Sequence, residues 1–371
     1  ASSLSMLAVA ISAPLLGNLS DRAGRRMPFL IAATIICCLF TAGIGPGARA
    51  QISPLMIIAL FVGANIAYQL GLVFYNSLLP EVAPAGRIGR VGGIGVALGY
   101  LGSIFGMVMV LPFNEGEVFG LEIPFIQAGG RPATFLPTAI LFLVFSLPIF
   151  ISLRDIRPER SLSRKKPFAE ILETLRDSRK YPGIRRFLVS KFLFQEGVET
   201  TILRMGIYAE KALGMADSAK VSFFVIATLG AAAGSALFGG LVDRKGSRRV
   251  LGLILVGWVI ALGGVILVSN RIVFTIIGAL VGALLGGVWT ASRPLLLELT
   301  PRGSEGRFFG LYSLSGKAAA IVGPLIWGGV TAILEPLGTQ VAYRSAVGAM
   351  ALLILAGYLV LRPLKTAAIR E

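Results

Sequence analysis

The chain alternates long apolar runs with short charged loops, and this pattern restricts the fold more than any other feature. A helix needs about 20 apolar residues to cross the hydrocarbon core of a bilayer. With 55% hydrophobic and 15% charged residues, the 371-residue chain is too apolar for an ordinary soluble domain. We therefore expect an all-α membrane protein with eleven spans, at 3–19, 27–46, 53–76, 92–112, 133–153, 185–208, 220–241, 249–268, 272–296, 308–334 and 343–361.

The basic residues indicate which loops face the cytoplasm. Of the 35 Lys and Arg residues, 25 lie in loops on one side of the predicted spans and 6 in loops on the other side. Such an excess is typical of cytoplasmic loops, so the net charge of +16 reflects topology rather than nucleic-acid binding. We expect the C-terminus inside and residue 1 outside; a twelfth span before residue 1 would put both ends inside.

One long polar connection divides the chain into an N-terminal bundle, 1–153, and a C-terminal bundle, 185–371. This connection, 154–184, carries apolar residues at helical spacing among charged ones, which predicts an amphipathic helix on the inner membrane face. It would act as a plain linker or take part in regulation. The apolar residues are Phe168, Ile171, Leu172 and Leu175.

Two short motifs occur twice, each time after an apolar run. GNLSDRAGRR, from Gly17 to Arg26, returns as GGLVDRKGSRR from Gly239, with Gly, Asp, Arg, Gly and Arg 222 positions later. EVAPAGRIGR, from Glu81 to Arg90, returns 217 positions later as ELTPRGSEGR. Both pairs fall in inner loops, so we infer two homologous halves of the same orientation, each with six spans once a further span is counted at the front.

These residues also carry a resemblance. GNLSDRAGRR resembles the signature loop of the major facilitator superfamily, which implies two six-helix bundles. YNSLLPEVAPAGRIGRVGGIGVALGYLGS, FLFQEGVETTILRMGIYA and SRPLLLELTPRGSEGRFFGLYSLSGKAAAIVGPLIWG resemble its vacuole effluxer, autophagy-related permease-like family and bacterial relatives. That resemblance implies export of small solutes, with amino acids leaving the vacuole in fungi. The family often has Asn-Asp-Gly where this chain has Gln195, Glu196 and Gly197, and the family's first helix has no counterpart here.

The repeated loop has a physical interpretation of its own. Glycine permits sharp turns and close backbone approach, and an aspartate is stabilised beside the N-terminus of a neighbouring helix. The arginines can pair with carboxylates or lipid phosphates, or merely anchor the topology. We predict a conformational gate in which Asp21 and Asp243 take the central part. Its candidate residues are Gly17, Asp21, Arg22, Arg25, Asp243, Arg244 and Arg248.

Charged residues inside predicted spans indicate a second candidate site. Glu196 and Glu199 lie near the middle of 185–208, on one helix face, and Lys317 lies near the middle of 308–334. Intramembrane charges are costly, so they are usually paired or functional. The carboxylates would hold a substrate amine or a coupling proton, and Lys317 a carboxylate; a structural Glu-Lys pair is the alternative.

Polar residues in corresponding spans of the two halves suggest cavity walls. Asn65, Gln69 and Asn76 recur on one face of 53–76, and Arg293 corresponds to Asn76 across the repeat. Interhelical hydrogen bonds would also explain the stripe in the first half, and a helix-end anchor would explain Arg293.

The sequence favours a secondary transporter over an enzyme. It contains no histidine, its adjacent Cys37 and Cys38 make no metal framework, and no nucleophile and base stand together, so we expect no catalytic residue, metal or cofactor. We expect a monomer in the inner membrane of a bacterium, which exports a small polar solute such as an amino acid, with a coupling proton. Drug or metabolite efflux, or a receptor or scaffold on the same fold, are the alternatives.

Overall fold

The computed structural model describes residues 2–84, 86–118, 121–123, 125–153, 182–301 and 303–364. Each predicted span coincides with one long helix, to within a few residues. In the first half these are α1 (Ser2–Ala23), α2 (Met27–Arg49), α3 (Pro54–Ser77), α5 (Ile88–Glu115) and α6 (Gly130–Ser152). In the second half they are α8 (Pro182–Leu213), α9 (Asp217–Lys245), α10 (Ser247–Leu267), α11 (Arg271–Leu299), α12 (Glu305–Leu334) and α13 (Thr339–Leu361).

The remaining described elements are short and lie in connections. They are the helix α4 (Leu79–Val82), a 3₁₀ turn (Glu335–Leu337), and a two-stranded antiparallel ribbon of β1 (Glu117–Val118) and β2 (Leu121–Glu122). The amphipathic helix predicted in 154–184 falls almost wholly on residues outside the described part of the chain.

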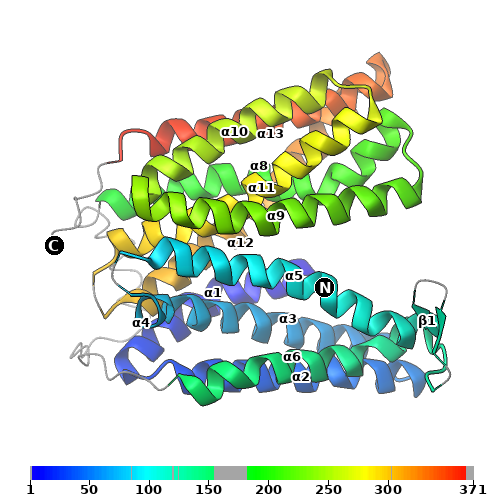
Figure 1. Ribbon diagram of the computed structural model, residues 1–371, viewed down its shortest axis with the longest axis vertical. Helices are drawn as coiled ribbons and strands as arrows, with labels where there is room; N and C mark the ends of the chain where they lie inside the picture. The colour runs from blue at the N-terminus through cyan, green and yellow to red at the C-terminus, as the bar shows by residue number, and fades with distance from the viewer. Residues whose placement is uncertain are drawn as a thin grey trace. The chain divides into compact units, whose positions relative to one another are not determined.

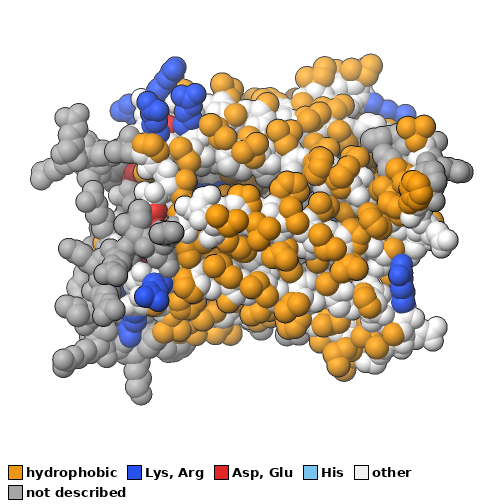
Figure 2. Space-filling view, turned by 60° about the horizontal axis from the view of Figure 1, so that its bottom comes forward, with side chains coloured by type: hydrophobic (Ala, Val, Ile, Leu, Met, Phe, Trp, Pro, Cys, Tyr) orange, Lys and Arg blue, Asp and Glu red, His pale blue; other side chains and the backbone are white. Residues whose placement is uncertain are grey.

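The helices have the length and surface of membrane spans. Eight of those described are long and apolar enough to cross a bilayer, namely α2, α3, α5, α6, α9, α10, α11 and α13. Helix α8 has a lower hydropathy because Lys191, Glu196 and Glu199 interrupt its apolar run. Hydrophobic side chains cover most of the face shown in Figure 2. The protein is therefore an integral, multi-pass, all-α membrane protein.

The helices of each half pack mainly against one another. In the first half α2 contacts α3 and α6, and α1 contacts α3 (Figure 1). Met27, Leu30, Phe74 and Leu78 form a buried cluster at the end of α3. In the second half α9 lies along α11, α8 along α13, and α10 against α11 and α13.

Small residues let the backbones of α9 and α11 touch. A Cβ atom added at Gly282 would lie 1.9 Å from the carbonyl oxygen of Ala227, and one at Gly234 would lie 2.3 Å from that of Ala283. Interfaces of this kind rely on small residues because hydrophobic burial does not drive helices together within lipid.

The chain forms two compact units, whose boundaries differ from those of the sequence halves at two places. One unit consists of Ala1–Leu78, Gly102–Leu172 and Arg302–Leu314, and the other of Leu79–Leu101, Glu173–Pro301 and Ser315–Glu371. The first turns of α5 and α12 thus each belong to the unit formed mostly by the opposite half of the sequence. This exchange positions the candidate gate.

We predict that Gly282→Ala destabilises the protein, because the new methyl group would overlap the backbone of α9. Overpacking of this kind costs about 1–3 kcal/mol, and a lower midpoint of thermal unfolding in detergent would show it. Gly263→Ala in α10 is the matched control, since a Cβ atom there meets nothing within 4 Å. Equal midpoints for the two variants would contradict this packing.

Candidate functional site

The two repeated motifs contact each other crosswise. The first copy of the Gly-Asp-Arg loop, at the end of α1, contacts the second copy of the other motif, at the start of α12. The second copy of the loop, at the end of α9, contacts the start of α5. We call these contacts the α1–α12 clasp and the α9–α5 clasp. Each lies within one compact unit.

In the α1–α12 clasp, the Asp21 carboxylate accepts two backbone hydrogen bonds. Its Oδ1 accepts from the N–H of Gly306 at 3.0 Å, and its Oδ2 accepts from the N–H of Arg307 at 2.7 Å. Both N–H groups belong to the first turn of α12, where backbone donors have no partner within the helix. The carboxylate also meets the positive end of the helix dipole, which stabilises it.

The α9–α5 clasp repeats this geometry. Asp243 Oδ1 accepts from the N–H of Gly89 at 2.7 Å, and Oδ2 accepts from that of Arg90 at 2.8 Å. Helix α5 begins at Ile88, so these donors again belong to a first turn. Since Gly89 and Arg90 correspond to Gly306 and Arg307 across the repeat, the two clasps are equivalent sites.

Glycines allow the helices of each clasp to approach this closely. A Cβ atom at Gly17 would lie 2.2 Å from the carbonyl oxygen of Gly306, and one at Gly239 would lie 2.6 Å from that of Gly89. The glycine after each aspartate ends its helix with a positive φ angle, 61° at Gly24 and 82° at Gly246. The repeated glycines therefore serve both packing and helix termination.

The arginines of the predicted gate have different surroundings. Arg25 and Arg244 are exposed, and Arg22 is half-buried. Arg248 donates from Nη1 to the backbone carbonyl groups of Arg362, at 3.1 Å, and Leu364. Because Arg25 and Arg244 are exposed, their surroundings fit the alternative in which they anchor the topology of the protein better than a role in the clasps.

Two gate residues that were not among the candidates lie in the α1–α12 clasp. Arg26 is 4% exposed and its Nη2 lies 3.2 Å from Asp21 Oδ1 and 2.6 Å from Glu305 Oε2. A sequence signal existed for Glu305, an acidic residue of the second motif just before a predicted span. The repeat also distinguished Arg26, which Arg248 matches in the second copy, from the exposed Arg25, which Ser247 matches.

A second cluster of polar residues is buried along α8. Gln195 and Glu196 are each 1% exposed. Glu196 Oε2 accepts a hydrogen bond from the N–H of Gly323 in α12, directly before Pro324. Proline has no N–H, so α12 continues through Pro324 but lacks one helical hydrogen bond next to the point where the carboxylate binds it. The other carboxylate oxygen, Oε1, has no hydrogen-bond partner among the residues that the structure describes.

The same helix carries a buried cation and a second carboxylate. Glu199 is half-buried and its Oε1 accepts from Gln195 Nε2 at 2.6 Å. Lys191 is 2% exposed, and its Nζ would lie 2.7 Å from a Cβ atom at Gly316 of α12. Lys317 lies on α12, but its side chain is outside the described part of the structure. The cation that the structure places in this cluster is thus Lys191.

The polar residues of α3 and α11 do not join this cluster in the described contacts. Asn65 Nδ2 donates to Ser5 Oγ of α1 at 2.8 Å. This contact is an interhelical hydrogen bond, the alternative to a cavity wall for this residue. Gln69 and Asn76 are half-buried. Arg293 is also half-buried; its buried Nε has no partner among the described residues.

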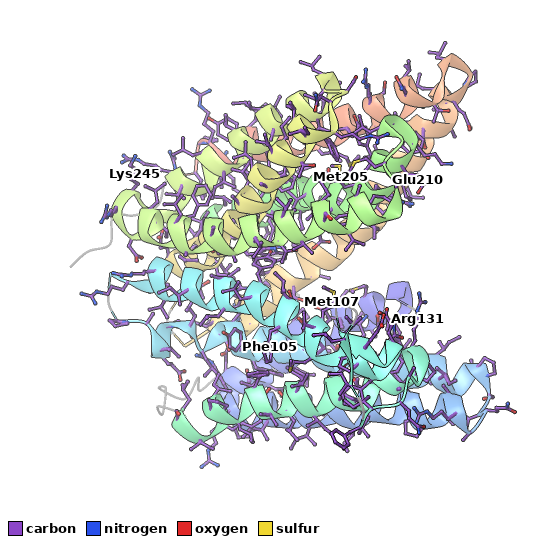
Figure 3. All side chains as sticks on the ribbon, turned by 45° about the vertical axis from the view of Figure 1, so that its right-hand side comes forward. Phe105, Met107, Arg131, Met205, Glu210 and Lys245 are labelled. Carbon is purple, nitrogen blue, oxygen red and sulfur yellow. The ribbon has the colours of Figure 1, made fainter. Side chains whose placement is uncertain are left out.

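An apolar cavity of about 100 Å³ lies further along α8, between α8, α9, α10 and α11. Tyr100 of α5 and Met205 of α8 are among its lining residues, and Figure 3 labels Met205. No charged side chain is among the lining residues, so the cavity suits an apolar group.

We predict that Gly323→Ala destabilises the contact of α12 with α8. A Cβ atom at this position would lie 2.0 Å from Thr200 Oγ1 and 2.5 Å from Glu196 Oε2. The expected cost is about 1–3 kcal/mol of unfolding free energy, seen as a lower thermal midpoint. Gly328→Ala, in open space on the same helix, is the control, and a Thr200→Ala change should partly rescue Gly323→Ala.

The chain matches the model of one protein family, "Vacuole effluxer Atg22 like", over residues 85–367. It is 25% identical over 336 residues to the uncharacterized MFS-type transporter YxiO of Bacillus subtilis (strain 168), with 87% of this chain and 75% of that protein covered. It is 27% identical over 280 residues to autophagy-related protein 22 of Gibberella zeae. The match covers 67% of this chain and 41% of that protein. The chain thus spans less than half of this fungal relative.

Solved structures of major facilitator transporters share the fold. The outward-conformation structure of the transporter FucP superposes with a TM-score of 0.75 at 14% identity, covering 99% of this chain and 89% of that one. The structure of the human organic anion transporter MFSD10 superposes with a TM-score of 0.70 at 16% sequence identity. The match covers 97% of this chain and 82% of that one. The fold and the family describe a transporter rather than an enzyme. The chain belongs to the Atg22-like vacuole effluxer family, within the major facilitator superfamily.

Proposed function

We propose that the protein exports a small polar solute, of the amino-acid class, by alternating access and in exchange for protons. The observation that carries this proposal is the set of buried acid, base and amide groups on α8 in a chain that belongs to an effluxer family. It would work as a monomer, with its basic loops on the cytoplasmic side. Two bacterial relatives support a place in a bacterial cytoplasmic membrane.

The two clasps would serve as the gate. Each joins helices from different halves of the sequence through a carboxylate and two backbone N–H groups, with no side chain between the backbones. Hydrogen bonds of a charged acceptor are strong, yet water can replace them when the helices part. Such contacts fit a structure that must close firmly and still open in each transport cycle.

The α8 cluster would recognise the solute. A zwitterionic solute needs an anionic partner for its amine and a cationic one for its carboxylate. Glu196 or Glu199 would supply the first, and Lys191 or Lys317 the second. Arg293 and the α3 residues Asn65, Gln69 and Asn76 stay secondary candidates for the walls of the solute pathway.

Glu196 is the residue we assign to proton coupling. It is buried, its Oε1 has no partner among the described side chains and backbone groups, and its Oε2 accepts from the N–H of Gly323, next to Pro324 in α12. A carboxyl group that is bound through one oxygen to the backbone of α12 can accept a proton on the other oxygen. Protonation of Glu196 would weaken the hydrogen bond that its carboxylate accepts from α12.

A second candidate function is efflux of a drug or other apolar metabolite. The uncharged cavity beside α8 favours it, because an apolar solute would need no partner for a charge. A receptor or scaffold on the same fold would bind a solute without moving it. Counterflow of labelled solute in liposomes separates these functions, since a scaffold shows none.

We predict that Glu196→Gln abolishes proton-driven flux but spares exchange of solute for solute. The variant keeps the hydrogen-bond acceptor for Gly323 and removes the titrating group. The measurement is uptake of labelled amino acids into inside-out proteoliposomes with and without a pH gradient, after a thermal-shift screen of amino acids and sugars has identified a bound solute. The exposed Glu335 supplies the control, Glu335→Gln.

Two results would contradict this account. Unchanged dependence of flux on the pH gradient in Glu196→Gln would exclude Glu196 as the coupling residue. Flux of apolar drugs with no flux or counterflow of any amino acid would replace the proposed solute class with the second candidate function.

A further inference from the structure

The two clasps share their backbone hydrogen bonds but differ in the charges around them. Arg26 and Arg248 occupy equivalent positions of the first motif, 222 residues apart. Glu305 of the second motif is equivalent, 217 residues apart, to Ile88. One clasp therefore has an acidic residue at the start of its captured helix, and the other has an apolar one.

In the α1–α12 clasp this difference produces a buried ion triad. The Arg26 guanidinium lies between Asp21, at 3.2 Å, and Glu305, at 2.6 Å, and it also donates to the carbonyl oxygen of Ser77 at 2.8 Å. The side chains of Asp21, Arg26 and Glu305 are 4%, 5% and 13% exposed. Arg26 thus ties α1, the end of α3 and the start of α12 together.

In the α9–α5 clasp the equivalent arginine makes other contacts. Arg248 donates to carbonyl groups that follow α13, within its own half of the sequence. Across the described ranges, no Lys or Arg side chain forms an ion pair with Asp243, which is half-buried. Among the described residues, opening this clasp breaks the two hydrogen bonds to Gly89 and Arg90 and no ion pair of Asp243.

Opening the α1–α12 clasp breaks the same two hydrogen bonds and also separates Arg26 from Glu305. A well-shielded, short ion pair resists separation more than an exposed one, because less water screens it. The extra pair therefore adds resistance to one of two contacts that share the same pair of backbone hydrogen bonds.

We propose that the α1–α12 clasp is the tighter of the two, that Glu305 makes it so, and that the α9–α5 clasp opens first. This inference rests on the gating role proposed above for the clasps. It makes Glu305 and Arg26 positioning residues of the gate, and it makes the order of opening a property of this chain's own sequence.

Amide hydrogen exchange of the four captured N–H groups measures each clasp directly. Gly306 and Arg307, like Gly89 and Arg90, lie in first helical turns and have no acceptor within their helices, so their protection comes from the clasp. In the purified protein in nanodiscs, we expect protection factors about tenfold higher at Gly306 and Arg307. Fragmentation of the exchanged peptides gives the exchange rate of each single amide. Division by the intrinsic exchange rate of each residue then allows the four N–H groups to be compared.

Glu305→Gln tests the assigned residue. It keeps the size of the side chain and removes the charge, so we expect protection at Gly306 and Arg307 to fall about tenfold while Gly89 and Arg90 stay unchanged. Ile88→Gln is the matched control in the other clasp and should leave Gly306 and Arg307 unchanged. Thermal midpoints of both variants establish that each is folded.

Equal protection of all four groups in the wild type would overturn the proposal, as would a Glu305→Gln variant that keeps full protection at Gly306 and Arg307. Asp21→Asn separates this failure from failure of the gate. If Asp21→Asn lowers the protection of Gly306 and Arg307 and Glu305→Gln does not, only the proposed difference in strength between the two clasps is wrong. If neither variant lowers this protection, the clasp does not hold the two N–H groups and the proposed gate is wrong as well.

Discussion

A carboxylate that binds the exposed backbone N–H groups of a neighbouring helix is the interaction on which this structure depends. Asp21 and Asp243 use it at the first turns of α12 and α5. The first turn of a helix has donors without partners and a positive dipole, so a carboxylate there satisfies both. The arrangement works only where glycine lets the backbones touch, which explains why each motif combines an acid with glycines at fixed spacing.

The same device recurs in the middle of α12. Glu196 binds the N–H of Gly323 where Pro324 interrupts the helical hydrogen bonds. An acid, a glycine and a weakened helix thus occur together at three places in the described structure, twice at helix starts and once within a helix. In each case the carboxylate binds backbone N–H groups of the neighbouring helix rather than its side chains.

Much of the fold followed from apolar run lengths, because a span needs a fixed number of apolar residues and the loops between spans are charged. All eleven predicted spans are helices, and the expected major facilitator fold is confirmed. The pairing between the motifs was not predictable in the same way. Each motif pointed to an inner loop, but only the three-dimensional exchange of the first turns of α5 and α12 brings the first copy of one onto the second copy of the other.

The candidate site could be predicted only in part, because its contacts also depend on tertiary structure. The charges of Glu196, Glu199 and Lys191 are unusual within an apolar span, but the sequence does not show which of these side chains turns toward a neighbouring helix. The repeat favours Arg26 over Arg25, because Arg248 matches Arg26 and Ser247 matches Arg25, but it does not show which carboxylates Arg26 meets. Ion pairs between residues 279 positions apart, such as Arg26 and Glu305, depend on tertiary structure alone.

The central claim is that transport requires the clasps to part, and a reversible cross-link tests it most directly. Arg26 Nη2 lies 2.6 Å from Glu305 Oε2 across the α1–α12 clasp, so Arg26→Cys with Glu305→Cys can be joined by a cleavable thiol-reactive reagent in a Cys37→Ser/Cys38→Ser background. Neither change adds a side chain at the glycines where the two backbones touch. Solute counterflow in liposomes should stop when the pair is joined and return when the reagent is cleaved; a fully cross-linked protein that transports as fast as its cleaved form would contradict the account.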